Sequence, residues 1–413
     1  MNTISIEQVN TFGDWAYLAV SKHFAKILKH EAGVLKDKEP EELHQMRVGM
    51  RRLRSAITGF ASALDLPPDA TQKKVGKIAR VLGELRDLDV LEDTLKNNYQ
   101  PILPTKEQKH LDKALKVLAK KRKKAFKKVK NILNDDLYLD LKIGLQEWLE
   151  EPNYQEIATI SINEVLPDLL LPQISKLLLH PGWLVGVKSE AGKMKLPQNL
   201  SKEEVEELLD TEGYELHELR KEAKRSRYQM ELFTQFYGEE YQEYLQQVKE
   251  IQTVLGDIQD SYVLTEFLTG VFDSDLKKKM PNLTALLTES CHQKWLEWEK
   301  IQQKFLDYQT RQNFHITVLH PTIKTATDRE NIEEKETTEN SKNGENIEEE
   351  KTRENQTNGL NIEEEKTREN QENGLNFKEI VPEKPEKNGN TVQLDKNEHW
   401  KRWYYINLTR GTS

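Results

Sequence analysis

Apolar and polar residues alternate along most of the first 320 residues with the spacing of amphipathic helices. The clearest example is 43–60, LHQMRVGMRRLRSAITGF, where a helix at about 100° per residue gathers the apolar residues into one stripe. That stripe consists of Leu43, Met46, Met50, Leu53, Ile57 and Phe60. The same periodicity predicts helices over 6–35, 41–64, 71–99, 106–133 and 137–149. In the second part of the chain it predicts helices over 201–209, 213–236, 239–269 and 281–310.

Prolines mark where several of these helices end. Pro67 and Pro68 follow the second helix, and Pro101 and Pro104 follow the third. The segment 152–198 is rich in proline and glycine, so we expect one helix and an irregular connection there. Long amphipathic helices with short breaks predict an all-α fold of two antiparallel four-helix bundles.

A row of basic residues lies beside the apolar stripe and recurs 173 residues later. The first copy is His44, Arg47, Arg51 and Arg54, and the second is His217, Arg220, Lys224 and Arg227. The same offset relates VLGELRDLDVL, from Val81, to VLGDIQDSYVL, from Val254. One offset shared by two motifs indicates an internal duplication. We expect a first bundle repeat at 1–150, a connecting segment at 151–200 and a second repeat at 201–315.

The composition changes near residue 321. Three acidic 15-residue units begin at Asn331, Asn346 and Asn361, with too few aliphatic residues to bury a core. We therefore predict a disordered acidic tail over 321–413. Its end at 399–408, HWKRWYYINL, is aromatic and basic, and it is either a docking motif for a partner or merely a sticky chain end.

The net charge of −9 is distributed unevenly. From Pro321 onward there are 15 Lys and Arg against 21 Asp and Glu, whereas 106–130 holds 12 basic residues against two acids. Such a local excess of positive charge indicates a polyanionic ligand. The single cysteine, Cys291, excludes an intramolecular disulfide and a cysteine-based zinc cluster. Without a signal-peptide pattern or a membrane-spanning stretch, the chain is expected to be cytoplasmic, with no membrane partner and no cofactor.

The two basic rows and the LGxxRDxDVL element resemble those of the CHAD proteins, α-helical domains named for their histidines. The matching segments are 44–47, 51–54, 82–90 and 217–228, and the resemblance covers roughly residues 1–315. It implies two four-helix bundles related by a pseudo-two-fold axis. It also implies that basic helix faces line a channel that binds inorganic polyphosphate. In the second copy Gln259 replaces Arg86, so the two halves are not expected to contribute equally.

Polyphosphate carries closely spaced charges and no bases, so its expected ligands are cationic donors on rigid helices. In the first repeat we predict His44, Arg47, Arg51, Arg52, Arg54, Lys73, Lys77, Arg80, Arg86, Lys120, Lys124 and Lys128. In the second repeat we predict His217, Arg220, Lys224, Arg225 and Arg227. Asp87 and Asp260 are expected to brace helices or to orient arginines.

Three other functions compete with this one. Metal binding is disfavoured, because the cationic neighbours of His44 and His217 repel a dication. Nucleic-acid binding is an alternative that 106–130 would permit, although Tyr228 is the one aromatic residue interleaved with the basic rows. A part in phosphoanhydride metabolism is the third, but the chain has no P-loop or nucleophile motif. We therefore expect a non-catalytic binding protein that associates with polyphosphate granules.

Overall fold

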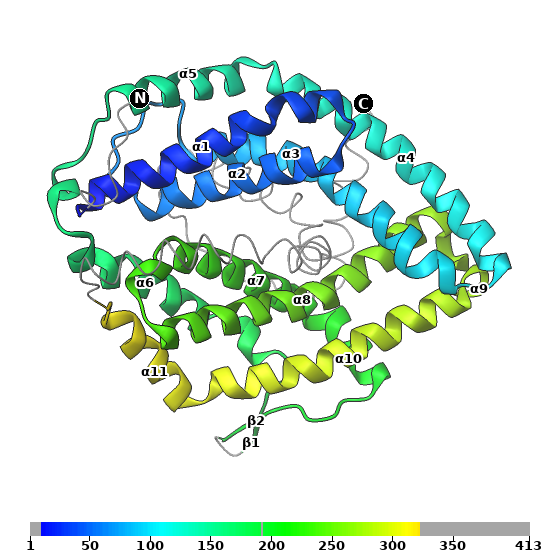
Figure 1. Cartoon of the computed structure of the whole chain (residues 1–413). Helices are drawn as coiled ribbons and strands as arrows, with labels where there is room; N and C mark the ends of the chain where they lie inside the picture. Colours follow the sequence, from blue (N-terminus) through cyan, green and yellow to red (C-terminus); the bar gives the residue numbers. More distant parts are fainter. Residues whose placement is uncertain (1–9, 191–192, 323–413) are drawn as a thin grey trace, which may run out of the picture. The chain divides into compact units, whose positions relative to one another are not determined.

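The computed structural model describes residues 10–190 and 193–322, which form an all-α fold with one small β-ribbon (Figure 1). The helices of the first repeat are α1 (Phe12–Lys36), α2 (Pro40–Gly59), α3 (Gln72–Asp93), α4 (Thr105–Leu133) and α5 (Asp136–Glu150). The second repeat contains α6 (Ile162–Leu178), α7 (Lys202–Leu232), α8 (Glu239–Phe272), the short α9 (Leu276–Lys279), α10 (Pro281–Leu306) and α11 (Tyr308–Leu319). The predicted tail and its aromatic end lie outside the described residues and stay predictions.

Side-chain caps explain where several helices begin. At α1, Thr11 accepts a hydrogen bond from the backbone N–H of Asp14, whose carboxylate accepts one from the backbone N–H of Thr11. Ser201 and Glu204 form the same reciprocal capping box at the start of α7, as their spacing in the sequence suggests. Each box satisfies backbone donors that a helix start leaves without partners.

The helix ends repeat the offset of the sequence motifs. Gly59 ends α2 and Leu232 ends α7, 173 residues apart, and Leu133 and Leu306 end α4 and α10 at the same spacing. One more helix follows in each copy: α5 after α4, and α11 after α10. Asp135 caps α5 and Asp307 caps α11, each through a hydrogen bond from a backbone N–H to the aspartate. The prediction of one helix over 281–310 is therefore wrong, because the extended backbone of Asp307 separates α10 from α11.

Three more boundaries differ from the predictions. Residues 202–232 form one helix rather than two, because Gly213 continues the helical backbone. The helix predicted over 71–99 ends at Asp93 and is followed by a six-residue π-helix, Thr94–Tyr99. The connection predicted to be irregular contains an antiparallel ribbon of β1 (Lys188–Glu190) and β2 (Lys193–Lys195).

Neighbouring helices pack in the same order in the two repeats. In the first, α1 packs against α2, α2 against α3 and α3 against α4; in the second, α6, α7, α8 and α10 follow this order (Figure 1). The helices α2 and α7 also contact each other, and one hydrophobic cluster spans both repeats. Within it, the rings of Phe60 and Phe233 lie 5.3 Å apart in an edge-to-face contact. The two repeats therefore share a core, with α2 and α7 at its centre.

Glu107, one of the two acids in the basic segment 106–130, ties the repeats together at a second place. Its buried carboxylate accepts hydrogen bonds from the backbone N–H groups of Asn282 and Leu283, at 3.0 Å each. These donors belong to the first turn of α10, where a carboxylate also compensates the positive end of the helix dipole. The other acid, Asp112, accepts a hydrogen bond from Gln100.

No helix in the described part of the chain is both long and apolar enough to cross a membrane.

Candidate functional site

The apolar stripe of α2 is buried as predicted, and the basic row beside it is also largely covered. His44 and Arg47 are buried, and Arg51, Arg52 and Arg54 are half-buried. On α7, His217, Arg220 and Arg227 are buried, whereas Lys224 and Arg225 are half-buried. The two basic rows therefore belong to a largely covered region. Its centre, which we call the α2–α7 seam, consists of Arg47, Arg51, Arg220, Lys224, Arg227 and Tyr228.

Polar contacts hold α2 and α7 together beside the seam. Glu231 of α7 forms two ion pairs at 3.2 Å, one with Arg52 of α2 and one with Arg227 of α7. Gln229 donates a hydrogen bond to the carbonyl oxygen of Ser55. A Cβ atom at Gly59 would lie only 2.5 Å from the side-chain oxygen of Gln229, so glycine permits this close approach. These contacts fix the spacing between the two rows.

An aspartate from each repeat faces the seam cations. Arg47 and Asp87 of α3 form an ion pair at 3.6 Å, with both side chains only 10% exposed. Burial raises the pKa of Asp87 well above its ordinary value, and the charges of Arg47 and Lys224 oppose that rise. Burial also raises the pKa of Asp260, on α8, to about 8, against the opposing charges of Arg220 and Lys224. The ion pair agrees with the expectation that Asp87 orients an arginine.

Crowding of positive charge shows most clearly at Lys224. Burial lowers its pKa well below the ordinary value, and the nearby charges of Arg47, Arg51 and Arg220 lower it further. Asp87 is the neighbour that acts in the opposite direction. An anion placed among these side chains would remove part of the repulsion. The electrostatics of the seam therefore favour a negatively charged ligand.

His44 lies in the same field. Burial lowers the pKa of its imidazole to about 4, and the charges of Arg86, Arg51 and Arg47 add to this effect against the opposing charge of Glu41. The ring is consequently neutral near pH 7 when no anion is bound. His44 can still donate one N–H hydrogen bond in this form. Protonation would give it a second N–H donor and a positive charge.

A second basic row lies on α3 beside α2. The guanidinium group of Arg54 lies over Gly76, where a Cβ atom would approach it to between 3.2 and 3.4 Å. Lys73 and Arg80 are three and four residues from Gly76 and share its side of α3, and Lys77 is four residues from Lys73 and three from Arg80. The structure thus places Arg54 beside these predicted ligands. At the corresponding positions of α8 stand Gln246, Glu250 and Thr253, so this row has no basic counterpart in the second repeat.

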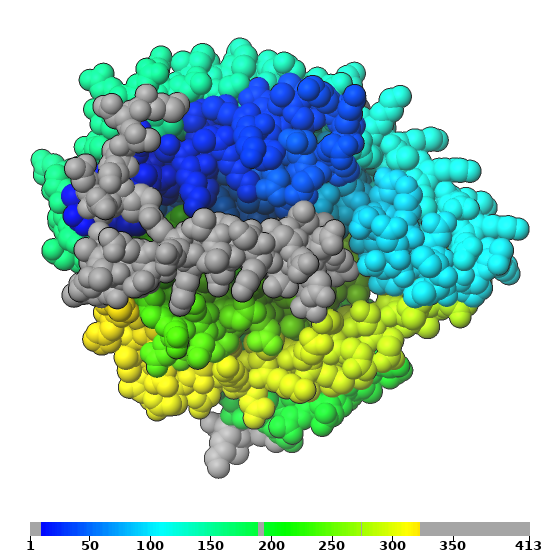
Figure 2. Space-filling model, in the orientation of Figure 1, coloured from blue at the N-terminus to red at the C-terminus, as the bar shows by residue number. Residues whose placement is uncertain are grey.

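The basic helix α4 presents most of its lysines to solvent. Its buried face includes Leu111, Leu118 and Val129. On the opposite side runs a line of exposed residues that we call the lysine ridge: Lys106, Lys109, Lys113, Lys116, Lys120, Lys123, Lys124, Lys127 and Lys130. Figure 2 shows the side chains of this stretch projecting outward at the edge of the view. At 1.5 Å per residue, the ridge is about 36 Å long.

The lysines predicted on α4 therefore differ from the arginines of the seam. Lys120 and Lys124 are exposed members of the ridge and lie away from the buried face of their helix. Lys128 forms an ion pair at 2.8 Å with Glu84 of α3. Within the described part of the chain, no ridge lysine has an ion pair. The helical periodicity was correct, but charge alone could not show which side of α4 faces its neighbours.

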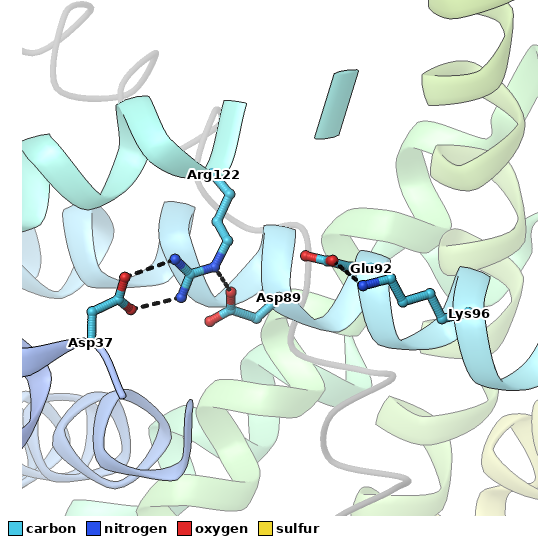
Figure 3. A network of polar contacts seen from close by, with 5 residues as sticks. All are labelled: Asp37, Asp89, Glu92, Lys96 and Arg122. Atoms are coloured by element: carbon cyan, nitrogen blue, oxygen red, sulfur yellow. Dashed lines mark hydrogen bonds and ion pairs between the residues drawn. The ribbon is translucent and has the colours of Figure 1, made fainter. Parts of the chain in front are cut away.

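Arg122, in the same basic run, attaches α4 to residues outside its own helix. Figure 3 shows its guanidinium group between two aspartates. It donates to both carboxylate oxygens of Asp37, at 2.7 and 2.9 Å, and its Nε donates to Asp89 of α3 at 2.7 Å. These contacts raise the pKa of Arg122 above its ordinary value. Tyr262 stands at the corresponding position to Asp89 in the second repeat, so that repeat lacks the same attachment.

A cavity of about 390 Å³ opens beside this network. Arg86 and Arg122 line it, but so do Glu41, Glu92 and Asp93. Glu92 also forms an ion pair with Lys96, as Figure 3 shows. With both signs of charge in its walls, the cavity suits a polyanion less well than the seam does. Arg86 therefore lines a cavity whose other walls include several acidic side chains.

Arg52 and Arg225 occupy equivalent positions in the two repeats, and both are engaged by acids. Arg52 pairs with Glu231 across the seam. Arg225 pairs with Glu222, one turn earlier on α7, and Glu222 also accepts a hydrogen bond from Gln173 of α6. Each of these two arginines is 40% exposed. They flank the seam and stabilise the packing of α7.

In the described residues, no cluster of three or more His, Cys, Asp or Glu side chains suits a metal ion.

The fold and the paired basic rows define an all-helical protein with an internal repeat and a cationic seam between its halves. Residues 18–269 match the CHAD domain family, and the chain belongs to that family. Comparison with curated proteins found no match.

Two solved structures are similar to this chain. One is the crystal structure of the CHAD domain from the plant Ricinus communis, at 20% identity and a TM-score of 0.46, covering 77% of this chain and 94% of that one. The other is PptA from Streptomyces chartreusis, at 14% identity and a TM-score of 0.49, covering 72% of this chain and 99% of that one.

Proposed function

We propose that this chain binds inorganic polyphosphate along the α2–α7 seam without acting on it chemically. The observation that carries the proposal is the convergence of two cationic rows, one from each repeat, on helices that share a core. Arginine presents a planar fork of donors that matches phosphate oxygens, and rigid helices reduce the entropy lost on binding. Burial lowers the pKa of Lys224, and the nearby charges of Arg47, Arg51 and Arg220 lower it further; a phosphate chain would offset the repulsion among these charges.

The chemistry of the seam favours polyphosphate over a nucleic acid. Single-stranded nucleic acids are usually held by aromatic rings on which the bases stack. Tyr228 is the aromatic residue of the seam, and the guanidinium groups of Arg51 and Arg227 already lie over its ring, which leaves little room for a base. A chain of phosphates needs no stacking surface.

The lysine ridge supports a second candidate, sequence-independent contact with duplex DNA. Its lysines are exposed along about 36 Å, a length over which B-DNA presents about 20 phosphate charges. Flexible ammonium groups provide affinity for backbone phosphates but do not read base edges. The ridge would bind DNA weakly and with a strong dependence on salt.

Titration of the full chain with polyphosphate, duplex DNA and single-stranded DNA distinguishes the two candidates. At matched phosphate concentration and about 0.15 M salt, we expect polyphosphate to bind at least about tenfold more tightly than either DNA. Equal or tighter binding of DNA would reject polyphosphate as the preferred ligand. Incubation of the chain with polyphosphate should release no orthophosphate, and sustained release that depends on the protein would contradict a non-catalytic role.

A further inference from the structure

Tyr228 lies where the two repeats bring their arginines together. The guanidinium carbon of Arg51, from α2, lies 4.7 Å from the centre of the Tyr228 ring, and that of Arg227, from α7, lies 4.5 Å from it. Cation–π attraction to one shared ring opposes the repulsion between these two like charges. In the first repeat the corresponding residue is Ser55. The Tyr228 ring therefore contacts an arginine from each repeat, a role that Ser55 cannot take in the first repeat.

Neighbouring contacts fix the orientation of the pair. Glu231 forms an ion pair with Arg227 and another with Arg52 of α2. Arg227 is thus held by a carboxylate one turn along α7 as well as by the ring. Because the guanidinium group is planar, contact with a ring restricts the directions in which its N–H donors can point.

The hydroxyl group of Tyr228 differs from those of other buried tyrosines. Tyr138 donates to Glu31, Tyr237 to the carbonyl oxygen of Val318, and Tyr241 to that of Met230. Tyr228 is only 6% exposed, yet its hydroxyl group makes no hydrogen bond within the described residues. Burying a hydroxyl group without a partner costs free energy, so phenylalanine would suit a purely structural position better. A ligand oxygen would satisfy this donor.

We propose that Tyr228 is a positioning and binding residue of the polyphosphate site. Its ring aligns Arg51 and Arg227 across the seam, and its hydroxyl group donates a hydrogen bond to a phosphate oxygen of the bound chain. This inference rests on the proposed function and adds a hydroxyl donor to the arginines of the seam. It also gives the seam a component that the first repeat does not duplicate.

Two substitutions in the full chain separate the ring from the hydroxyl group. Tyr228→Phe keeps the ring and removes the donor, so we expect polyphosphate affinity to fall about fivefold with an unchanged dependence on salt, because no charge is lost. Tyr228→Leu removes both features, and we expect a loss of about 20-fold. The near-ultraviolet difference spectrum produced by polyphosphate should lose its tyrosine component in Tyr228→Phe.

Tyr241→Phe provides the matched control, because Tyr241 is a buried tyrosine that bonds within the protein. It should lower thermal stability without changing polyphosphate affinity. If the wild-type chain binds polyphosphate and Tyr228→Phe binds it equally well, the role of the hydroxyl group is wrong. If Tyr228→Leu is folded and also binds equally well, the role of the ring is wrong. Failure of the wild-type chain to bind polyphosphate would instead reject the proposed function itself.

Discussion

The α2–α7 seam and the lysine ridge are both strongly basic, but they present their charge in different ways. The seam gathers arginines from two packed helices, covers them largely from solvent and faces them with Asp87 and Asp260. The ridge carries lysines that are exposed on one side of α4. Charges in water are screened within about 8 Å at physiological salt, whereas covered charges are screened much less.

The number of cationic side chains in a region therefore does not determine how much that region contributes to polyphosphate affinity. The ridge contains more cationic side chains than the seam, but each is hydrated and flexible, and each would lose entropy when held against a phosphate. The seam side chains have already lost much of that freedom on folding. We therefore expect the seam to provide most of the affinity and specificity, and the ridge to provide long-range attraction.

The largest effect is expected from removing the two guanidinium groups that share the Tyr228 ring. Arg51→Gln combined with Arg227→Gln should lower polyphosphate affinity by about 100-fold or more, because hydrogen bonds between charged groups contribute about 1.5–3 kcal/mol each. Lys109→Gln combined with Lys113→Gln makes the same change of charge on the ridge. A comparable loss from that control pair would show that net charge, not the seam, determines binding.

Glutamine is a better substitution than glutamate at these positions. Arg47 and Arg51 lie off the apolar stripe, so the sequence alone would predict that replacing both by glutamate leaves the fold intact. Arg47, however, is buried and pairs with Asp87. A glutamate there would face a second buried carboxylate, which destabilises the protein independently of any ligand. The circular dichroism of each variant should be compared with that of the wild type.

The seam should also make stability depend on pH in a way that the ridge does not. Native Asp260 keeps its proton up to a pH of about 8, whereas an unfolded aspartate releases it near 3.8. Between these values the native state binds more protons, so the contribution of Asp260 to the free energy of unfolding falls as pH rises. The free energy of unfolding of Asp260→Asn, measured relative to that of the wild type, should therefore increase between pH 5 and pH 8. We expect this increase to exceed about 1.4 kcal/mol, the free energy that corresponds to one pKa unit.

Denaturant unfolding of the two proteins across this pH range measures that difference. The comparison between variants is needed because His44 acts in the opposite direction. Its native pKa of about 4 lies below the unfolded value of 6.5, so its contribution to stability is lost as pH falls through this interval. A constant difference between Asp260→Asn and the wild type would mean that Asp260 is not held protonated.

Neutralising the ridge should have a smaller effect, confined to low salt. Replacing Lys109, Lys113, Lys116, Lys120, Lys123 and Lys127 by glutamine should weaken polyphosphate binding about fivefold at 0.05 M salt and little at 0.3 M salt. Equilibrium titrations at several salt concentrations measure both the loss and the slope. A large loss that persists at high salt would place the main site on α4.

The smallest effect concerns the tail. Residues from about 321 onward have a net charge of −6 and are tethered to a domain that contains the basic segment 106–130, so we expect them to compete weakly with polyphosphate. Truncation after Pro321 should raise affinity about twofold, mostly at low salt. Weaker binding by the truncated chain, or loss of its helical circular dichroism, would show that the tail supports the folded domain instead.

Periodicity and repetition predicted the fold well, because both follow from local spacing. The apolar stripe of α2, the capping box at Ser201 and the all-α class are confirmed by the structure. The break predicted before Gly213 was wrong, because one glycine in a helix costs only about 1 kcal/mol relative to alanine. Within α6, Pro167 and Pro172 are accommodated in a helix that buries Leu170, Ile174 and Leu177.

The site was less predictable, because its properties depend on contacts between distant residues. Sequence identified the basic rows, but it could not show that Arg122 attaches α4 to Asp37 and Asp89. In the sequence, Tyr228 stands out only as the aromatic residue interleaved with the basic rows. Its position one residue after Arg227 was the available signal, and only packing brings Arg51 to the same ring. Whether the predicted ligands contact polyphosphate stays a prediction.

A crystal structure of the full chain with bound polyphosphate would test the central claim most directly. We predict a chain of phosphate density along the α2–α7 seam, within hydrogen-bond distance of Arg51, Arg227 and the hydroxyl group of Tyr228. Phosphate density restricted to the lysine ridge of α4, with the seam closed or filled by protein, would contradict this account.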